Sequence, residues 1–216
     1  MRYSFLILLL PIVSLSFGQG RYPLHAATAT KVVATDNFDS YTTDGALLTG
    51  QGNWLRERLD QKVAYSASNG EVWSNGSGGN EVATYYNDTF DDDQYSEVKI
   101  TATNAGGQIG VSVRCGGGIS SYYLFYGNSS SCWFGKMDAG SFTSFGSGTA
   151  FEVNDIIRIE AEGTTIRAYR NGELDTSVGG GDGIVTDSGL TSGKAGLSGY
   201  NSTTSTRCDN WEGGNL

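Results

Sequence analysis

The densest group of ionisable side chains lies in the stretch NDTFDDDQYSEVKI, residues 87–100. Asp91, Asp92 and Asp93 are consecutive, and successive side chains of an extended chain point to opposite sides, so the three cannot converge on one ion. The run also lacks the alternating ligands and the glycine of an EF-hand loop. We therefore predict that Asp91 and Asp92 are solvated turn residues and that Asp93 bonds backbone amides before a strand beginning at Gln94. A calcium site is the alternative.

A second group of carboxylates lies on one predicted strand, in the stretch RIEAEG. Arg158, Glu160 and Glu162 alternate along this strand and therefore share one face. A two-residue turn beginning at Gly163 would place Glu160 opposite Arg167, which makes a cross-strand ion pair. We favour this ion pair over an acid–base pair and predict no catalytic residue here.

Aromatic residues gather on three neighbouring strands. The stretches 109–115, 122–126 and 132–137 are typical of a three-stranded meander. With an even pairing register at the Asn128 turn, one face is predicted to face the core and carries Val111, Val113, Cys115, Tyr122, Leu124, Tyr126, Cys132 and Phe134. The other face carries Ser112, Arg114, Tyr123, Phe125 and Trp133.

Aromatic rings beside polar groups on a solvent-facing sheet suit a sugar. The C–H face of a pyranose stacks on a ring, and its hydroxyls bond to the polar groups. We therefore predict a ligand-binding surface made of Arg114, Tyr123, Phe125 and Trp133. The alternative is that these rings are covered and belong to the core. A register slip of one residue would exchange the two faces.

Short strands separated by turns recur along the rest of the chain. Ser96, Val98 and Ile100 alternate with polar residues, and Asn171-Gly172 indicates a hairpin because both positions of a type I′ turn need a positive φ. The stretch VGGGDG, residues 178–183, is predicted to be a mobile surface loop, since no Gly-Lys-Ser/Thr follows it. The pattern predicts an all-β fold, a sandwich of two packed antiparallel sheets.

The N-terminal segment is predicted to be a secretory signal peptide. Arg2 precedes an apolar run at 5–17 that is short for a membrane span, and small residues follow at Ala26 and Ala27. We predict a leader over residues 1–26 and a single exported domain over 27–216, with no membrane insertion. Removing the leader also removes the only histidine, which excludes Ser-His-Asp, Cys-His and ordinary zinc-hydrolase chemistry.

Charge and cysteine usage limit the partners and the cross-links. The net charge of the chain is −9, and an acidic surface argues against nucleic acid and anionic membranes as partners.

The chain has three cysteines, Cys115, Cys132 and Cys208. In a meander the first two are separated by a third strand, which is too far for a disulfide. We predict that any disulfide involves Cys208, or that all three thiols are buried.

Several motifs resemble the concanavalin A-like lectin/glucanase superfamily, and most of all the laminin G-like jelly-roll modules of secreted bacterial proteins. They are DNFDSY, GNW, DDQYSEV, RIEAEGTTIRAYRNG and GKAGLSGY with CDNWEG, and they span nearly the whole chain after the leader. The resemblance implies a jelly roll whose first and last strands lie near each other, with Trp54, Trp73 and Trp211 as anchors. Because several jelly-roll lectins hold calcium, it also implies Asp36 and Asp209 as metal candidates.

The superfamily includes lectins, carbohydrate-binding modules, glycosidases and polysaccharide lyases, so its fold does not choose a function. The laminarinase-type acid motif is incomplete after Glu162, and a lyase would need a tyrosine base with Arg114 or Lys194 to neutralise a uronate. We therefore predict a secreted carbohydrate-binding domain that recognises a polysaccharide through its aromatic sheet face, with a structural calcium ion as its one candidate cofactor. The alternatives are a polysaccharide-degrading enzyme on the same face and a surface adhesion module that contacts proteins.

Overall fold

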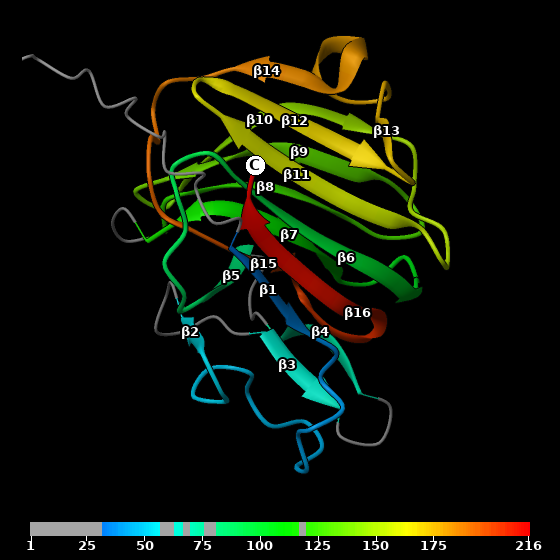
Figure 1. Cartoon of the computed structure of the whole chain (residues 1–216). Helices are drawn as coiled ribbons and strands as arrows, with labels where there is room; N and C mark the ends of the chain where they lie inside the picture. The colour runs from blue at the N-terminus through cyan, green and yellow to red at the C-terminus, as the bar shows by residue number, and fades with distance from the viewer. Residues whose placement is uncertain (1–31, 57–62, 67–69, 76–80, 117–119) are drawn as a thin grey trace, which may run out of the picture. The chain divides into compact units, whose positions relative to one another are not determined.

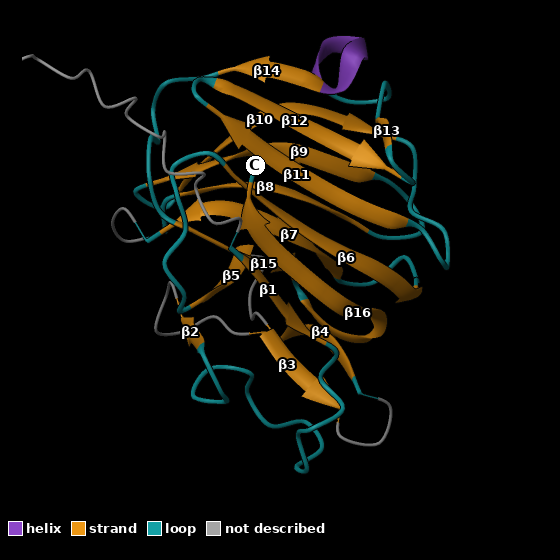
Figure 2. Cartoon of the chain, in the orientation of Figure 1, coloured by secondary structure: helices purple, strands orange, loops and turns teal. Residues whose placement is uncertain are grey.

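A computed structural model describes residues 32–56, 63–66, 70–75, 81–116 and 120–216. The predicted leader, residues 1–26, and its boundary at Ala27 lie outside the described residues. Strands make up most of the described chain, and η1 (Gly179–Gly183) is its one helical turn (Figure 2). No helix among the described residues is long and apolar enough to cross a membrane.

Sheet A contains nine antiparallel strands in the described part of the chain. Their order is β13-β12-β11-β6-β16-β4-β3, with β1 also paired to β16 and β14 to β12. The strands are β1 (Val33–Asp36), β3 (Val63–Ser66), β4 (Glu71–Asn75), β6 (Gln94–Ala102), β11 (Ile156–Glu162), β12 (Thr165–Arg170), β13 (Glu173–Leu174), β14 (Ile184–Thr186) and β16 (Ser202–Asn215).

Sheet B contains seven antiparallel strands over the same described ranges, in the order β10-β9-β8-β7-β15-β5-β2. Figure 1 shows β11, β12 and β16 of sheet A in front of β7, β8 and β9 of sheet B. The strands are β2 (Trp54–Arg56), β5 (Glu81–Tyr86), β7 (Gln108–Cys115), β8 (Tyr122–Gly127), β9 (Cys132–Asp138), β10 (Ser141–Gly148) and β15 (Lys194–Tyr200). The predicted two-sheet antiparallel sandwich is confirmed.

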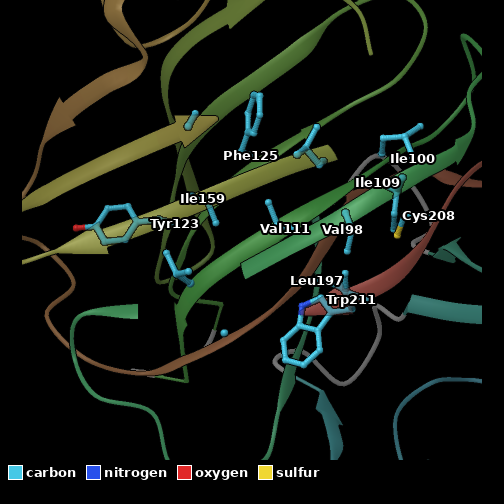
Figure 3. Packing of buried hydrophobic residues seen from close by; sticks show 14 of the residues in the cluster. Val98, Ile100, Ile109, Val111, Tyr123, Phe125, Ile159, Leu197, Cys208 and Trp211 are labelled. Carbon is cyan, nitrogen blue, oxygen red and sulfur yellow. The ribbon is translucent and has the colours of Figure 1, made fainter. Parts of the chain in front are cut away.

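The main core fills the space between the two sheets. Sheet A contributes the alternating side chains of β6 and β11, including Val98, Ile100 and Ile159, all fully buried. Sheet B contributes Val111 and Leu197 from its central strands (Figure 3). The predicted alternation of β6 is confirmed, because Ser96, Val98 and Ile100 are buried while Glu97 and Lys99 between them are partly exposed.

The first and last described strands lie side by side. β1 pairs with the second half of β16, with Asp36 opposite Trp211. The indole of Trp54 packs edge-on against Trp211 at a centroid distance of 4.9 Å, and both rings are buried. Trp73 on β4 is also buried, at 8% exposed. The expected contact of the DNF and DNW segments and the anchoring role of the tryptophans are therefore confirmed.

Two glycine-containing turns were predicted with different success. Asn171 and Gly172 have φ values of 54° and 84° and join β12 to β13, as a type I′ turn requires. Residues 180–182 are exposed, which confirms the predicted surface position of the stretch 178–183, while its mobility stays a prediction. Its residues wind into η1, where Gly179, Gly180 and Gly181 all have positive φ and the amide of Gly183 bonds to the carbonyl oxygen of Val178 at 3.1 Å.

Candidate functional site

Strand β8 presents the opposite faces from those predicted. Val111 pairs with Phe125 and Val113 with Tyr123, and Phe125 then pairs with Phe134 on β9. Tyr123 and Phe125 therefore join the main core, where both are 0% exposed (Figure 3). The prediction that these two rings lie on a solvent-facing surface is wrong. Tyr122, Leu124 and Tyr126, which were predicted to face the core, lie on the other side of sheet B.

The turn at Asn128 is the physical reason for this inversion. Gly127 pairs with Cys132, so the loop contains four residues and shifts the pairing by one from the predicted register. The amide of Asn128 bonds to the Ser131 carbonyl at 3.0 Å, and its side-chain oxygen accepts the amide of Ser130 at 2.9 Å. The Asn128 side chain stabilises a turn of this length. The length of the turn decides which residues of β8 share a face with which residues of β9.

Arg114 also lies on a different side of the sheet from the predicted one. It has a φ of 55° at a bulge in β7, and its side chain is 1% exposed. Its guanidinium donates to the carbonyl oxygens of Asp92 and Leu190 at 3.0 and 2.8 Å, and its amide donates to the Gln94 side chain at 3.1 Å. The arginine therefore ties β7 to the start of β6, which corrects its prediction as a ligand residue.

Trp133 is the one predicted ligand residue that lies on the outer side of sheet B with part of its surface exposed. There it belongs to a second apolar cluster, separate from the main core. We call this surface the aromatic face, and it comprises Tyr85, Cys115, Tyr122, Leu124, Tyr126, Trp133, Met137 and Tyr200. Tyr85, Trp133 and Tyr200 are partly exposed, and the other five are buried.

The rings of the aromatic face flank a strip of small residues. Trp133 stacks on Tyr126 with ring centroids 5.8 Å apart and an interplanar angle of 26°. Tyr126 pairs with Gly110, where a Cβ atom would lie 2.1 Å from the Phe125 carbonyl oxygen, so only glycine permits this approach. On the far side of the strip is Tyr85, paired with Gly196.

Sequence reasoning missed Tyr85 and Tyr200 as members of this face. A signal for Tyr200 existed, because Gly196, Ser198 and Tyr200 alternate with apolar residues along β15. No comparable signal existed for Tyr85, since its place follows from the long-range pairing of β5 with β15.

The carboxylates of the β11–β12 hairpin lie on the outer side of sheet A. Glu160 pairs with Arg167, which confirms the predicted register. The predicted ion pair is wrong, because Arg167 contacts Glu162 at 2.8 Å and Glu160 contacts Arg158 at 2.8 Å. These side chains are held in charge pairs along the hairpin.

Glu97 extends this charge network across β6. Arg158 lies 3.7 Å from the Glu97 carboxylate, and its guanidinium stacks over the Tyr95 ring at 3.6 Å. A small pocket of about 270 Å³ is lined by these charged groups and by Tyr169. Burial raises the pKa of Glu97, with the neighbouring Glu212 charge adding to this effect and Arg158 opposing it. The arginine serves as the shared counter-ion of Glu97 and Glu160.

The acidic run Asp91–Asp93 forms an exposed turn before β6. Asp91 and Asp92 are exposed, which confirms their prediction as solvated turn residues. Asp93 accepts a backbone amide at 2.7 Å, but the donor is Gly163 in the β11–β12 turn and not an amide beside the run. The Asn215 side chain exchanges two hydrogen bonds with Asp91, at 2.8 and 2.9 Å. The run therefore anchors the start of β6.

We expect that calcium does not stabilise the protein through this acidic run. In an Asp91→Asn/Asp93→Asn variant, the calcium-dependent shift in melting temperature should equal that of the wild type, because both carboxylates already accept protein donors. Thermal unfolding in the presence of calcium and in the presence of a chelator measures this shift in melting temperature. A calcium stabilisation present in the wild type and lost in the variant would contradict this prediction.

The two metal candidates at the joined strands are engaged in hydrogen bonds. Asp36 accepts from the Tyr41 hydroxyl at 2.5 Å and from the Trp54 indole at 2.8 Å. Asp209 accepts from the Asn210 amide at 2.6 Å, and burial raises the pKa of its carboxyl. Among the described residues, no three acidic, histidine or cysteine side chains gather closely enough to hold a metal ion. Asp36 and Asp209 thus act as acceptors for neighbouring donors.

All three cysteines are buried thiols, which confirms the second of the two predicted alternatives. The Cys115 thiol donates to the Ser112 hydroxyl on the aromatic face at 3.1 Å. Burial raises the pKa of Cys132 to about 11 and raises that of Cys208 well above its usual range. Both groups are therefore protonated and poorly nucleophilic at neutral pH.

Comparison with known proteins supports the fold. No family model matches the chain, and no curated protein gives a significant match. Among solved structures, carbohydrate-binding module CBM66 from Bacillus subtilis has a TM-score of 0.51 at 15% identity over 76% of this chain and 96% of its own. The GlcNAcα1-4Gal releasing endo-β-galactosidase from Clostridium perfringens has a TM-score of 0.53 at 12% identity, over 86% of this chain and 62% of its own.

A structure described as a native glycosidic hydrolase has a TM-score of 0.53 at 13% identity, over 87% of this chain and 97% of its own. At such low identities the likeness concerns the fold alone, which is a concanavalin A-like jelly-roll sandwich. Proteins of this architecture include both binding modules and hydrolases, so the function has to be argued from the site.

Proposed function

We propose that this protein is a secreted carbohydrate-binding domain that holds a polysaccharide along the aromatic face of sheet B without cleaving it. The observation that carries the proposal is the partly exposed indole of Trp133, stacked on Tyr126 beside a strip of small residues. A sugar ring can stack on such an indole, and the partly exposed rings of Tyr85 and Tyr200 offer further contact area at the other border of the face.

The hydroxyl groups on this face suit the recognition of a sugar. Ser112 and Ser198, on the outer side of β7 and β15, are fully buried, so the hydroxyls that can meet a ligand are the phenols of the partly exposed Tyr85 and Tyr200. A ligand site needs a few such groups among apolar ones, because the polar groups fix orientation while the rings supply contact area. This combination favours a glycan over a purely apolar ligand.

Binding without cleavage is favoured by where the carboxylates lie. Most glycosidases use two carboxyl groups that flank the scissile bond. The two carboxylates that alternate along one strand, Glu160 and Glu162, lie on the outer side of sheet A and not on the aromatic face. Export rests on the predicted leader, and the laminin G-like subclass rests on the sequence motifs. Both stay predictions.

A panel of soluble and insoluble polysaccharides tests the proposal. Retention of the purified domain on at least one glycan is expected, with no change in viscosity and no new reducing ends. Release of oligosaccharides would instead support the enzyme. Retention on proteins but on none of the glycans would support the adhesion module.

Replacing Trp133 by Ala should weaken glycan retention by about 1–3 kcal/mol, which is roughly five- to 150-fold in affinity. The physical reason is the loss of the stacking surface, while the main core on the other side of the sheet stays intact. Affinity electrophoresis measures retention, and Trp133→Phe, which keeps a ring, is the matched control. If Trp133→Ala unfolds the domain, Trp133 is a core residue and the proposed surface fails.

A further inference from the structure

Four asparagines of this chain stand in the motif Asn-X-Ser/Thr, which is the acceptor for N-linked glycans in exported proteins. They are Asn75, Asn87, Asn128 and Asn201. The structure describes every side chain of the motif at Asn87 and at Asn128. These two motifs differ in the property that decides whether a folded protein can carry a glycan, which is the freedom of the asparagine side chain.

The Asn87 side chain lies on the surface. Asn87 directly follows β5, and both Asn87 and Thr89 of its motif are exposed. The backbone amide of Asn87 bonds to the carbonyl oxygen of Asn53 at 2.7 Å, which fixes the backbone beside β2. The side-chain amide of Asn87, in contrast, makes no hydrogen bond to another described residue. A group attached to its Nδ2 atom can therefore extend into solvent without breaking a bond of the fold.

The Asn128 side chain is held on both of its polar atoms. Asn128 is 2% exposed and lies in the turn between β8 and β9. Its Nδ2 atom donates to the carbonyl oxygens of Ala105 and Gly106 at 3.4 and 3.0 Å. Its Oδ1 atom accepts the backbone amides of Ser130 and Ser131 at 2.9 and 3.3 Å. The side chain thus closes its own turn and joins that turn to the loop between β6 and β7.

A glycan on Asn128 is incompatible with this structure. It would be attached through Nδ2, so it would replace a hydrogen that Asn128 donates to residues 105–106 and would occupy their space. The turn at residues 128–131, which sets the pairing of β8 with β9, would then lose its support. This holds even where a glycan is added before folding, because a chain modified at Asn128 cannot reach this structure.

We propose that Asn87 is an N-glycosylation site of the exported protein and that Asn128 is not, although both have the sequence motif. The co-reactant is an oligosaccharide linked to a lipid diphosphate. A bond forms between Nδ2 of Asn87 and C1 of the first sugar as the bond from C1 to the diphosphate oxygen breaks. Nδ2 loses one proton, and the lipid diphosphate leaves. The proposal rests on export, which stays a prediction, and is independent of the aromatic face.

Expression of the full chain in insect cells, whose secretory pathway attaches such glycans, tests the proposal. Enzymatic release of the glycans in heavy-oxygen water converts each glycosylated asparagine into a labelled aspartate, which peptide mapping locates. Most of the secreted molecules should carry the label at Asn87 and none at Asn128. An unlabelled Asn87, a label at Asn128, or a chain that never enters the secretory pathway would each overturn the proposal.

Two substitutions that leave both asparagines in place provide the matched pair. Thr89→Ala and Ser130→Ala each replace an exposed hydroxyl residue and destroy one motif. Thr89→Ala should remove one glycan from the secreted protein, which is seen as a loss of mass. Ser130→Ala should leave the mass of the attached glycans unchanged. Loss of a glycan in Ser130→Ala, or none in Thr89→Ala, would contradict the assignment.

A further measurement needs no glycosylation and uses protein made in a bacterium. Asn128→Gln should lower the melting temperature by about 4 °C or more, because buried hydrogen-bonding groups lose their partners. Asn87→Gln should change it by about 2 °C or less, as expected for a surface residue. Equal losses in the two variants would show that the Asn87 side chain is also held by the fold and would overturn the proposal.

Discussion

Replacing Arg170 by Met should lower the free energy of unfolding by about 3–5 kcal/mol, because it leaves buried carboxylates without their cation. The Arg170 side chain is only 16% exposed, and its guanidinium lies 2.7 Å from Asp175 and 3.7 Å from Asp155. It also donates to the carbonyl oxygens of Thr149 and Ala150 at 2.8 and 2.7 Å. One side chain thus ties β12 to the segment that follows β10. Urea unfolding measures the loss.

Arg167 on the same strand provides the matched control. Its partner Glu162 is 57% exposed, so Arg167→Met should cost about 1 kcal/mol or less. Replacing Asp175 by Asn in the Arg170→Met background should restore part of the stability, since it removes one unpaired charge. Equal effects of the two arginine substitutions would show that burial of the Arg170 ion pair contributes nothing to the free energy of unfolding.

Replacing Phe125 by Ala should also lower the free energy of unfolding by about 3–5 kcal/mol, as expected for a large core side chain. The ring is fully buried and meets Phe151 and Phe134 edge-on, at centroid distances of 5.2 and 6.3 Å. On a solvent-facing surface the same substitution would change stability by about 0.5 kcal/mol or less. The experiment therefore decides which way β8 faces.

Phe142→Ala is the control for Phe125. Phe142 is 36% exposed on β10 and touches Tyr126 edge-on at 6.3 Å, so its loss should cost roughly 1 kcal/mol. Thermal and urea unfolding of both variants give the comparison. A small effect of Phe125→Ala together with a large one of Phe142→Ala would reverse the assignment of the two faces of sheet B.

Alternating sequence patterns predicted the strands that carry them. On β6 a polar residue stands between each pair of apolar ones, so Val98 and Ile100 could be assigned to the core before their partners were known. Likewise, Asn171-Gly172 predicts its own turn, because the residue types that tolerate positive φ are few. In both places a local physical preference decides the structure.

Strand β8 carries no such pattern, since the run from Tyr122 to Tyr126 is aromatic and aliphatic throughout. Its faces depend on the length of the Asn128 loop and on the bulge at Arg114. Neither feature follows from the periodicity of the strand itself. The site predictions that failed, Arg114, Tyr123 and Phe125, are the residues that those two features control.

A pocket of about 720 Å³ where β1 meets β16 could not be predicted either, for a different reason. Its walls come from β1, from the turn after β1, from β5 and from β16, which are far apart in sequence. The sequence motifs indicated that Asp36 and Trp211 meet, but the open space beside this pair also depends on where Tyr86 packs. Local patterns carry no information about such a volume.

The position of β16 in the middle of sheet A has a consequence for the order in which the protein assembles. β16 lies between β6 on one side and β4 with β1 on the other, so residues 202–215 join two groups of strands that, among the described residues, have no other link within the sheet. During synthesis the two groups cannot be joined in this sheet until residues 202–215 have been made, so each keeps an unpaired strand edge until then. Contacts between strands so distant in sequence favour slow folding, because the intervening chain has to be closed into a loop before they can form.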